Sequence, residues 1–107
     1  MDSSLANAWT NKGAILNRLG RYNEALLALN IASELNPRDE TTQNEIGVAS
    51  YETVKYDDAL LAFNNATDIN PEYGLAWYNK GETLKSLGST TEANTAFAKA
   101  KDLGYTG

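Results

Sequence analysis

Apolar residues recur along the chain at intervals of three, four and seven, which is the spacing of one face of an α-helix. One stripe includes Trp9 and Leu16 and is broken at Gly20, as is usual near the C-terminus of a helix. A second stripe stops before Pro37, because the residue preceding a proline avoids the α region. The alternation continues to the end of the chain. It predicts six helices, at roughly 4–19, 22–35, 40–53, 56–69, 74–87 and 90–103.

The second apolar stripe occurs twice in the sequence. The segment GRYNEALLALNIASELNP, which begins at Gly20, and VKYDDALLAFNNATDINP, which begins at Val54, are identical at nine of eighteen positions and lie 34 residues apart. Other positions repeat three times with the same period: Trp9, Gln43 and Trp77; Gly13, Gly47 and Gly81; Ala25, Ala59 and Ala93; Leu29, Phe63 and Phe97; Ala32, Ala66 and Ala100. We therefore expect one domain, 1–107, built of three units at 6–39, 40–73 and 74–107.

The recurrent small residues suggest how the helices pack. A glycine inside a helix costs about 1 kcal/mol relative to alanine, so its repetition at 13, 47 and 81 indicates a close approach of the neighbouring helix. We expect the alanines at 25, 59 and 93 to meet these glycines. A single helical hairpin cannot bury its apolar face alone, whereas stacked hairpins can. Each copy is then the packing partner of the next.

Two local features modify this picture. Val54 stands where the other units have Gly20 and Gly88, so we expect the middle hairpin either to continue helically or to turn differently. The outcome decides whether the second helix of this hairpin folds back on its own chain or exchanges with that of another copy. Ser89 and Glu92 match a capping box, in which each side chain bonds a free backbone N–H. We expect residues 103–107 to fray.

These residues resemble the tetratricopeptide repeat family, whose 34-residue helix–turn–helix unit has Trp, Gly, Tyr, Ala, an aromatic residue or Leu, Ala and Pro at set places. The first unit has Trp9, Gly13, Tyr22, Ala25, Leu29, Ala32 and Pro37; the second has Gln43 for the tryptophan; the third has Thr90 for the tyrosine and Tyr105 for the proline. The resemblance implies an all-α, right-handed superhelical solenoid of three hairpins. It also implies a non-catalytic scaffold for protein–protein interaction.

In such arrays the first helices of the units line a concave groove that holds a peptide or a partner helix. By the resemblance, we expect the groove contacts to come from Asn11, Asn44, Glu45, Tyr51, Glu52, Tyr78, Asn79, Glu82 and Lys85. Asparagine amides can hold a peptide bond, and tyrosines offer flat apolar area at low entropic cost. The mixture of charges suggests a neutral or basic ligand.

One subgroup of the family grips a C-terminal carboxylate with lysines, asparagines and an arginine. The matching positions here are Thr10, Ala14, Glu45, Leu75 and Asn79, of which only Asn79 fits. We therefore expect no carboxylate clamp.

The composition disfavours several classes of partner and of activity. Nine basic and 14 acidic residues give a net charge of −5, which disfavours nucleic acid and anionic membrane as partners. With no histidine or cysteine, the chain lacks the commonest bases, nucleophiles and transition-metal ligands, so we expect no enzyme, metal or cofactor. The carboxylate pairs at Asp39-Glu40 and Asp57-Asp58 lie where a helix N-terminus favours negative charge. No signal or membrane-spanning segment is visible, and a cytoplasmic location is the default.

Two other functions stay open. The last unit has Asn94, Thr95 and Lys101 where earlier units have leucines and Ser33 or Thr67, as suits a terminal repeat, yet no separate capping helix follows. Either the third unit caps itself or a partner covers it. The first alternative function is self-association, either through the end faces into a homo-oligomer or by domain swapping. An RNA-binding helical repeat is the remote one, which the acidic balance disfavours.

Overall fold

The computed structural model describes residues 3–106, which form six helices and no strand. The helices are α1 (Ser3–Arg18), α2 (Tyr22–Leu35), α3 (Glu40–Glu52), α4 (Tyr56–Ile69), α5 (Gly74–Ser86) and α6 (Thr90–Asp102). Each bound agrees with the sequence prediction to within one residue, so the six helices are confirmed. None of the helices in the described part of the chain is long and apolar enough to cross a membrane.

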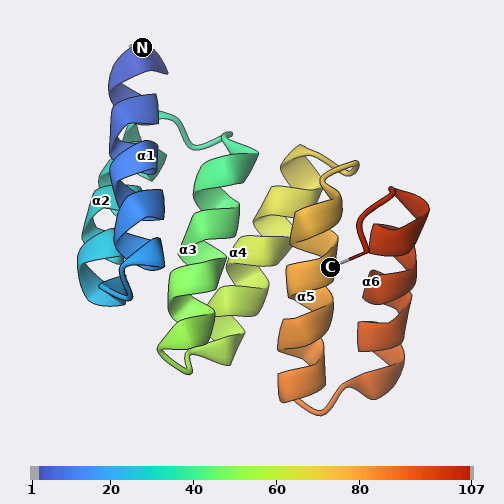
Figure 1. Cartoon of the computed structure of the whole chain (residues 1–107). Helices are drawn as coiled ribbons and strands as arrows, with labels where there is room; N and C mark the ends of the chain where they lie inside the picture. The colour runs from blue at the N-terminus through green and yellow to red at the C-terminus, as the bar shows by residue number, and fades with distance from the viewer. Residues whose placement is uncertain (1–2, 107) are drawn as a thin grey trace.

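The helices form three antiparallel hairpins that stand side by side in chain order (Figure 1). Each second helix also packs on the first helix of the next hairpin, α2 on α3 and α4 on α5. The first helices contact each other in series, α1 with α3 and α3 with α5, whereas the backbones of the second helices stay farther apart within residues 3–106. Because the first helices are the closer set, the array curves with α1, α3 and α5 on its inner side.

The turns that close the hairpins share one backbone arrangement. After α1, the N–H of Arg21 donates to the carbonyl of Leu16 at 2.9 Å, and the N–H of Gly20 donates to Asn17 at 3.0 Å. This pair of bonds satisfies carbonyls that the helix end leaves free, and it requires a residue with positive φ. Gly20 adopts a φ of 76° and Gly88, after α5, a φ of 84°.

The middle hairpin makes the same turn with valine in the glycine position. Val54 has a φ of 63°, and Lys55 donates to the carbonyl of Ser50 at 2.8 Å, as Arg21 does to Leu16. Neither expectation for this position holds, because the chain neither continues helically nor turns in another way. Instead α4 folds back on α3, and the β-branched side chain accepts a left-handed backbone that costs about 1–2 kcal/mol.

The mid-helix glycines admit large side chains of the second helices. A Cβ added to Gly81 would lie 2.6 Å from the ring of Phe97; one added to Gly47 would overlap Phe63, and one added to Gly13 would overlap Leu29. The atoms nearest to each added Cβ thus belong to the leucine or phenylalanine register, and the expectation that the alanines at 25, 59 and 93 meet the glycines stays a prediction. These alanines are buried, at 0, 0 and 1% exposure. The two helices of each hairpin do approach closely at the glycine, and the side chain that lies against it is Leu29, Phe63 or Phe97.

The proposed capping box at α6 is also absent. Ser89 precedes α6 but makes no side-chain capping bond. Its backbone N–H already donates to the carbonyl of Leu84 at 2.9 Å, so the partner that Glu92 would need is taken. The turn geometry, rather than a reciprocal pair of side chains, starts this helix.

Candidate functional site: the inner groove

The inner side of the array carries three hollows in succession. The first lies between α1 and α3, the second between α3 and α5, and the third beside α5, α6 and the segment after α6. Neighbouring hollows share lining residues: Val48, Glu52 and Asn79 between the first two, and Glu82 between the last two. The three hollows therefore form one continuous surface, which we call the inner groove.

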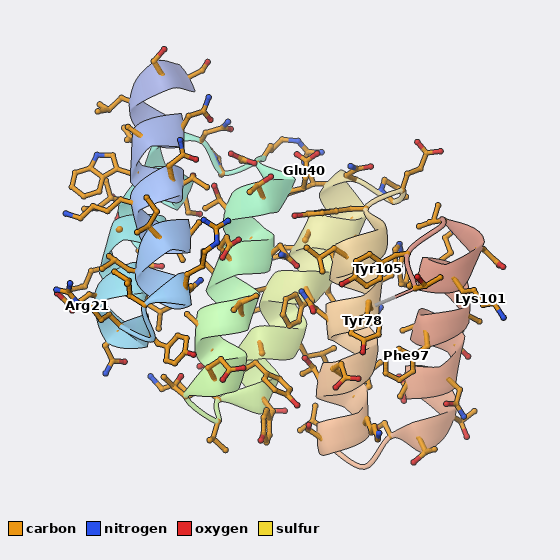
Figure 2. The ribbon with its side chains drawn as sticks, in the orientation of Figure 1. Arg21, Glu40, Tyr78, Phe97, Lys101 and Tyr105 are labelled. Carbon is orange, nitrogen blue, oxygen red and sulfur yellow. The ribbon has the colours of Figure 1, made fainter. Side chains whose placement is uncertain are left out.

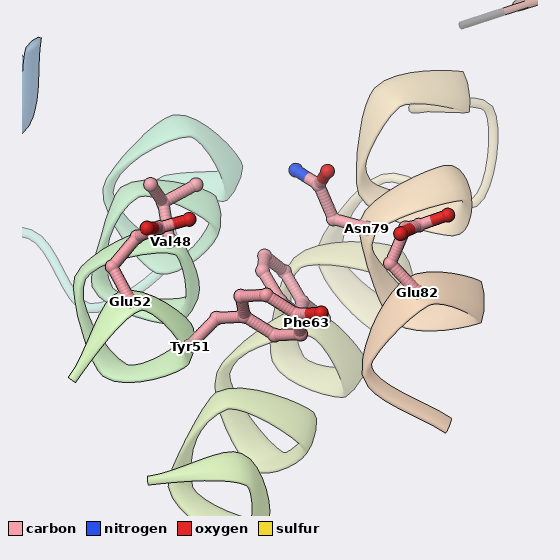
Figure 3. A pocket seen from close by; sticks show the side chains of 6 residues that line it. All are labelled: Val48, Tyr51, Glu52, Phe63, Asn79 and Glu82. Carbon is pink, nitrogen blue, oxygen red and sulfur yellow. The ribbon is translucent and has the colours of Figure 1, made fainter. Parts of the chain in front are cut away.

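The central hollow has an aromatic floor and acidic walls. It encloses about 210 Å³ and is lined by Val48, Tyr51 and Glu52 of α3, Phe63 of α4, and Asn79 and Glu82 of α5. Figure 3 shows Phe63 between the two inner helices, with the carboxylates of Glu52 and Glu82 on opposite sides. Phe63 is 1% exposed, so its ring lies beneath the other lining residues.

Hydrogen bonds between α3 and α5 fix the positions of the central side chains. The Tyr51 hydroxyl lies 2.8 Å from the Ser86 hydroxyl, and the Asn79 side-chain amide donates to the side-chain oxygen of Asn44 at 3.1 Å. Asn79 keeps its own side-chain oxygen and a second N–H, which are the groups that a peptide backbone requires. The central hollow is thus held in shape before any ligand arrives.

The hollow near the C-terminus is built on stacked aromatic rings. The Tyr78 ring lies 5.3 Å from Phe97 and 5.2 Å from Tyr105, in tilted arrangements that aromatic pairs favour. Figure 2 shows these three rings beside the last two helices, with Lys101 on α6. The hollow encloses about 460 Å³, and the negative charge of Glu82 raises the pKa of Tyr78 above its ordinary value. Tyr78 is therefore a hydrogen-bond donor at neutral pH.

The segment after α6 is ordered as far as Thr106, against the expectation of fraying. Gly104 has a φ of 91° and the N–H of Tyr105 donates to the carbonyl of Ala100 at 2.9 Å, so the chain turns back toward α5. Gly107 lies outside the described residues. The third hairpin covers part of its own end in this way.

The hollow nearest the N-terminus is polar. It is lined by Asn17 and Arg18 of α1 and by Glu45 of α3, among others. The Asn17 amide donates to the Glu45 carboxylate at 2.9 Å and to its backbone carbonyl at 3.1 Å. This bond ties the first hairpin to the second and leaves Arg18 exposed at the end of the groove.

The hollows include every predicted groove residue except Asn11, which is exposed on α1 and lines none of them. Asn44 lines the first hollow but is only 1% exposed, so it cannot offer a ligand more than an edge. Asn44, Thr10 and Tyr78 share one register, which faces the next hairpin along. Tyr78 has no such neighbour in the described chain and stays half-buried, which explains why it alone is accessible.

Groove residues outside the predicted contacts include Phe63, Phe97, Lys101 and Tyr105. Phe63 and Phe97 follow from the glycine register, since a glycine on the inner helix opens a path to the residue behind it. Tyr105 could be found only from the turn at Gly104. Phe97 and Tyr105 add half-buried apolar surface to the hollow near the C-terminus, whereas Phe63, at 1% exposure, adds little.

Charge is distributed unevenly along the groove. The central hollow is lined by two carboxylates and no cation. Arg18 lies at one end of the groove, and Lys85 and Lys101 lie at the other. The centre therefore favours a positive or neutral group.

A solenoid of helical hairpins with a continuous inner groove defines a class of repeat scaffolds. Family models of the tetratricopeptide repeat match residues 6–39 and 44–104. The chain belongs to the tetratricopeptide repeat family.

Solved structures share the fold. The second repeat domain of Spaghetti (RPAP3) bound to the HSP90 peptide SRMEEVD is 19% identical, with 94% of each chain covered and a TM-score of 0.91. The Yersinia enterocolitica type III secretion translocator chaperone SycD, as an alternative dimer, is 17% identical, with 95% of this chain and 77% of that chain covered and a TM-score of 0.89. MamA MSR-1 C2 is 25% identical, with 92% and 57% covered and a TM-score of 0.84. No curated protein matches the sequence.

Proposed function

We propose that this protein is a non-catalytic interaction module that binds a neutral or basic peptide, or a partner helix, in the inner groove. The observation that carries the proposal is the central hollow, in which Glu52 and Glu82 flank the Phe63 floor. A lysine or arginine side chain can lay its apolar stem on Val48 and Tyr51, above the buried Phe63 ring, and place its charge between the carboxylates. Asn79 would hold the adjoining backbone.

The proposal excludes an acidic peptide with a free C-terminal carboxylate. At the positions where the family's clamp would stand, Thr10 is 4% exposed and bonded to Thr42 at 2.6 Å, and Glu45 is an anion. Ala14 and Leu75 have no group that binds a carboxylate. The heptapeptide SRMEEVD, which the Spaghetti structure contains, is therefore expected not to bind.

Other features support a non-catalytic role. The acidic pairs have structural positions: Asp39 caps α3 by accepting from the Thr41 N–H at 2.9 Å, and Asp57 and Asp58 lie in the first turn of α4. There they favour the helix dipole. None of the three lines the groove.

The test is selection of peptides from a random display library on the purified protein, followed by calorimetry with the best binder. We expect enrichment of a lysine or arginine flanked by apolar residues. The double variant Glu52→Lys/Glu82→Lys should weaken the selected peptide at least about tenfold, because like charges then meet in the hollow. Binding that survives both reversals would refute the proposed site.

A matched control keeps the same change in net charge. Glu34 and Asp68 are exposed, lie 34 residues apart near the ends of α2 and α4, and line none of the groove hollows. The double variant Glu34→Lys/Asp68→Lys should bind the selected peptide as the parent does. An equal loss in both variants would show that overall charge, not the groove, governs binding.

A further inference from the structure

The two junctions between hairpins each contain a site that accepts the preceding second helix. At the first junction, Leu26 and Asn30 of α2 line a hollow of about 310 Å³ whose other walls belong to the second hairpin: Gln43, Ile46, Ser50, Lys55, Asp58, Leu61, Ala62 and Asn65. At the second junction, Leu60 of α4 packs against the buried cluster of Leu84, Ala93 and Ala96 in the third hairpin, against which Trp77 also packs. In each case a leucine at the same place in the repeat faces the following hairpin, and Leu26 forms part of the wall of its hollow.

The first hairpin carries the same acceptor on its outer side. A hollow of about 320 Å³ there is lined by Trp9, Lys12, Leu16, Arg21, Glu24, Leu27, Ala28 and Ile31. Each of these residues lies 34 positions before one of the eight second-hairpin residues at the first junction. We call this surface the N-terminal acceptor. It shares no lining residue with the three groove hollows.

The N-terminal acceptor has the same types of apolar residue as the third hairpin, where that junction surface is covered by α4. Trp9, Leu16 and Ala28 repeat the residue types of Trp77, Leu84 and Ala96 in the third hairpin, where Leu60 packs. The side-chain arrangement is repeated as well, since the Lys12 ammonium lies 5.1 Å from the Trp9 ring centroid and Lys80 lies 4.8 Å from that of Trp77. The site is therefore already formed.

The exposed fractions of equivalent residues show that the first hairpin lacks the cover that the later hairpins have. Ile15 is 53% exposed, whereas Ala49 and Thr83, at the same place in the later units, are both at 0%. Ala8 is exposed, while Thr42 and Ala76 are at 1 and 0%. At the later positions the preceding hairpin supplies the cover. Within the described chain, the first hairpin presents this junction surface to solvent.

We propose that the N-terminal acceptor docks an α-helix of a partner protein that presents a leucine and, four residues later, an asparagine. Both internal occupants have this pair, Leu26 with Asn30 and Leu60 with Asn64. The leucine enters between Trp9, Leu16 and Ala28. The exposed rim carries Lys12 and the Arg21–Glu24 ion pair, at 2.5 Å, a net positive charge that suits a helix with acidic residues beside its apolar stripe.

A second copy stacked end to end fits less well. Its α6 would present Asn94 and Ala98 where α2 and α4 present leucine and asparagine. Placing an amide in the apolar hollow leaves its polar atoms without partners. The partner is therefore a helix of the α4 type rather than α6 of this protein.

The probe is a helix-stabilised synthetic peptide with the sequence of residues 56–69, titrated calorimetrically into the full chain. Replacement of Leu60 by asparagine in the peptide should weaken binding at least about tenfold, because burial of the leucine is lost. In the protein, Ile15→Lys should have a similar effect without unfolding it, since this side chain is exposed. Amide NMR shifts should concentrate in residues 8–16 and 24–31.

Two control variants separate this site from others. Leu87→Lys introduces the same charge at an exposed apolar residue in the turn after α5 and should leave peptide binding unchanged. The groove variant Glu52→Lys/Glu82→Lys should also bind the peptide normally. If it does not, the peptide occupies the groove and the N-terminal acceptor is refuted.

Other results would also overturn the proposal. Equal affinity of the parent and the Leu60→Asn peptides would show that the leucine does not enter the hollow. Undiminished binding to Ile15→Lys would place the peptide elsewhere. A self-association measured by sedimentation and abolished by Ile15→Lys would assign the surface to a second copy instead of a partner helix.

Discussion

The middle and third hairpins are built on one 34-residue plan but fill it differently. At the places where the third has Trp77, Leu84 and Gly88, the middle has Gln43, Ser50 and Val54. Gln43 and Ser50 are 8 and 3% exposed, and Gln43 hydrogen-bonds Ser33 and Asn65. The Gln43–Ser33 bond crosses the first junction, where the apolar cluster of α2 also includes Ala49, and the Gln43–Asn65 bond lies within the middle hairpin. The middle hairpin thus has polar side chains in the register where the third has Trp77 and Leu84, which shows that helix period and small residues define the fold while the chemistry of this register can vary.

The largest difference should appear when the same register is truncated in both hairpins. Leu84→Ala is expected to lower the free energy of unfolding by about 3 kcal/mol, because a buried leucine leaves a cavity. Ser50→Ala should cost about 1 kcal/mol or less, since little volume is removed. Urea unfolding of both variants measures this, and equal losses would contradict the distinction between the two hairpins.

A second comparison concerns the glycines under the aromatic rings. Gly47→Ala should destabilise by about 1–2 kcal/mol, because its methyl group meets the fully enclosed ring of Phe63. Gly81→Ala should be close to neutral. Phe97 is half-buried beside an open hollow and can shift, while alanine improves helix propensity. Thermal unfolding of the two variants would disprove this account if Gly81→Ala were the more damaging.

The smallest effect is expected at the turns. Val54→Gly should stabilise the protein by about 0.5–1 kcal/mol, because relief of the left-handed strain exceeds the added freedom of the unfolded chain. The reciprocal change, Gly88→Val, should destabilise it by about 1 kcal/mol. Chemical unfolding measures both, and a loss of stability in Val54→Gly would show that the valine side chain, although exposed, contributes to packing.

The sequence was sufficient for the helices because the period, the apolar stripes and Pro37 and Pro71 constrain the same boundaries. It was insufficient for side-chain direction. The repeat placed Leu29, Phe63 and Phe97 in one register but did not show that they cover the glycines. The capping box failed because its backbone partner belongs to the preceding turn.

Prediction of the groove met a similar limit. The helices that line it follow from the repeat, and Glu52, Asn79 and Glu82 do lie together. Asn44 is one position before Glu45 on the same helix, yet it faces the next hairpin and is buried. Whether such a residue is accessible depends on how closely two hairpins approach, which pattern alone does not specify. The ring of Tyr105 depends on a turn with no counterpart in the repeat motif.

The repetition of tryptophan in only the first and last hairpins gives the molecule two intrinsic fluorophores with distinct surroundings. The Trp77 indole N–H donates to the Pro71 carbonyl at 2.8 Å, whereas Trp9 lines the open N-terminal acceptor. Replacing either one with phenylalanine leaves a single emitter. The emission wavelength then reports water access at one end of the array, without any added label.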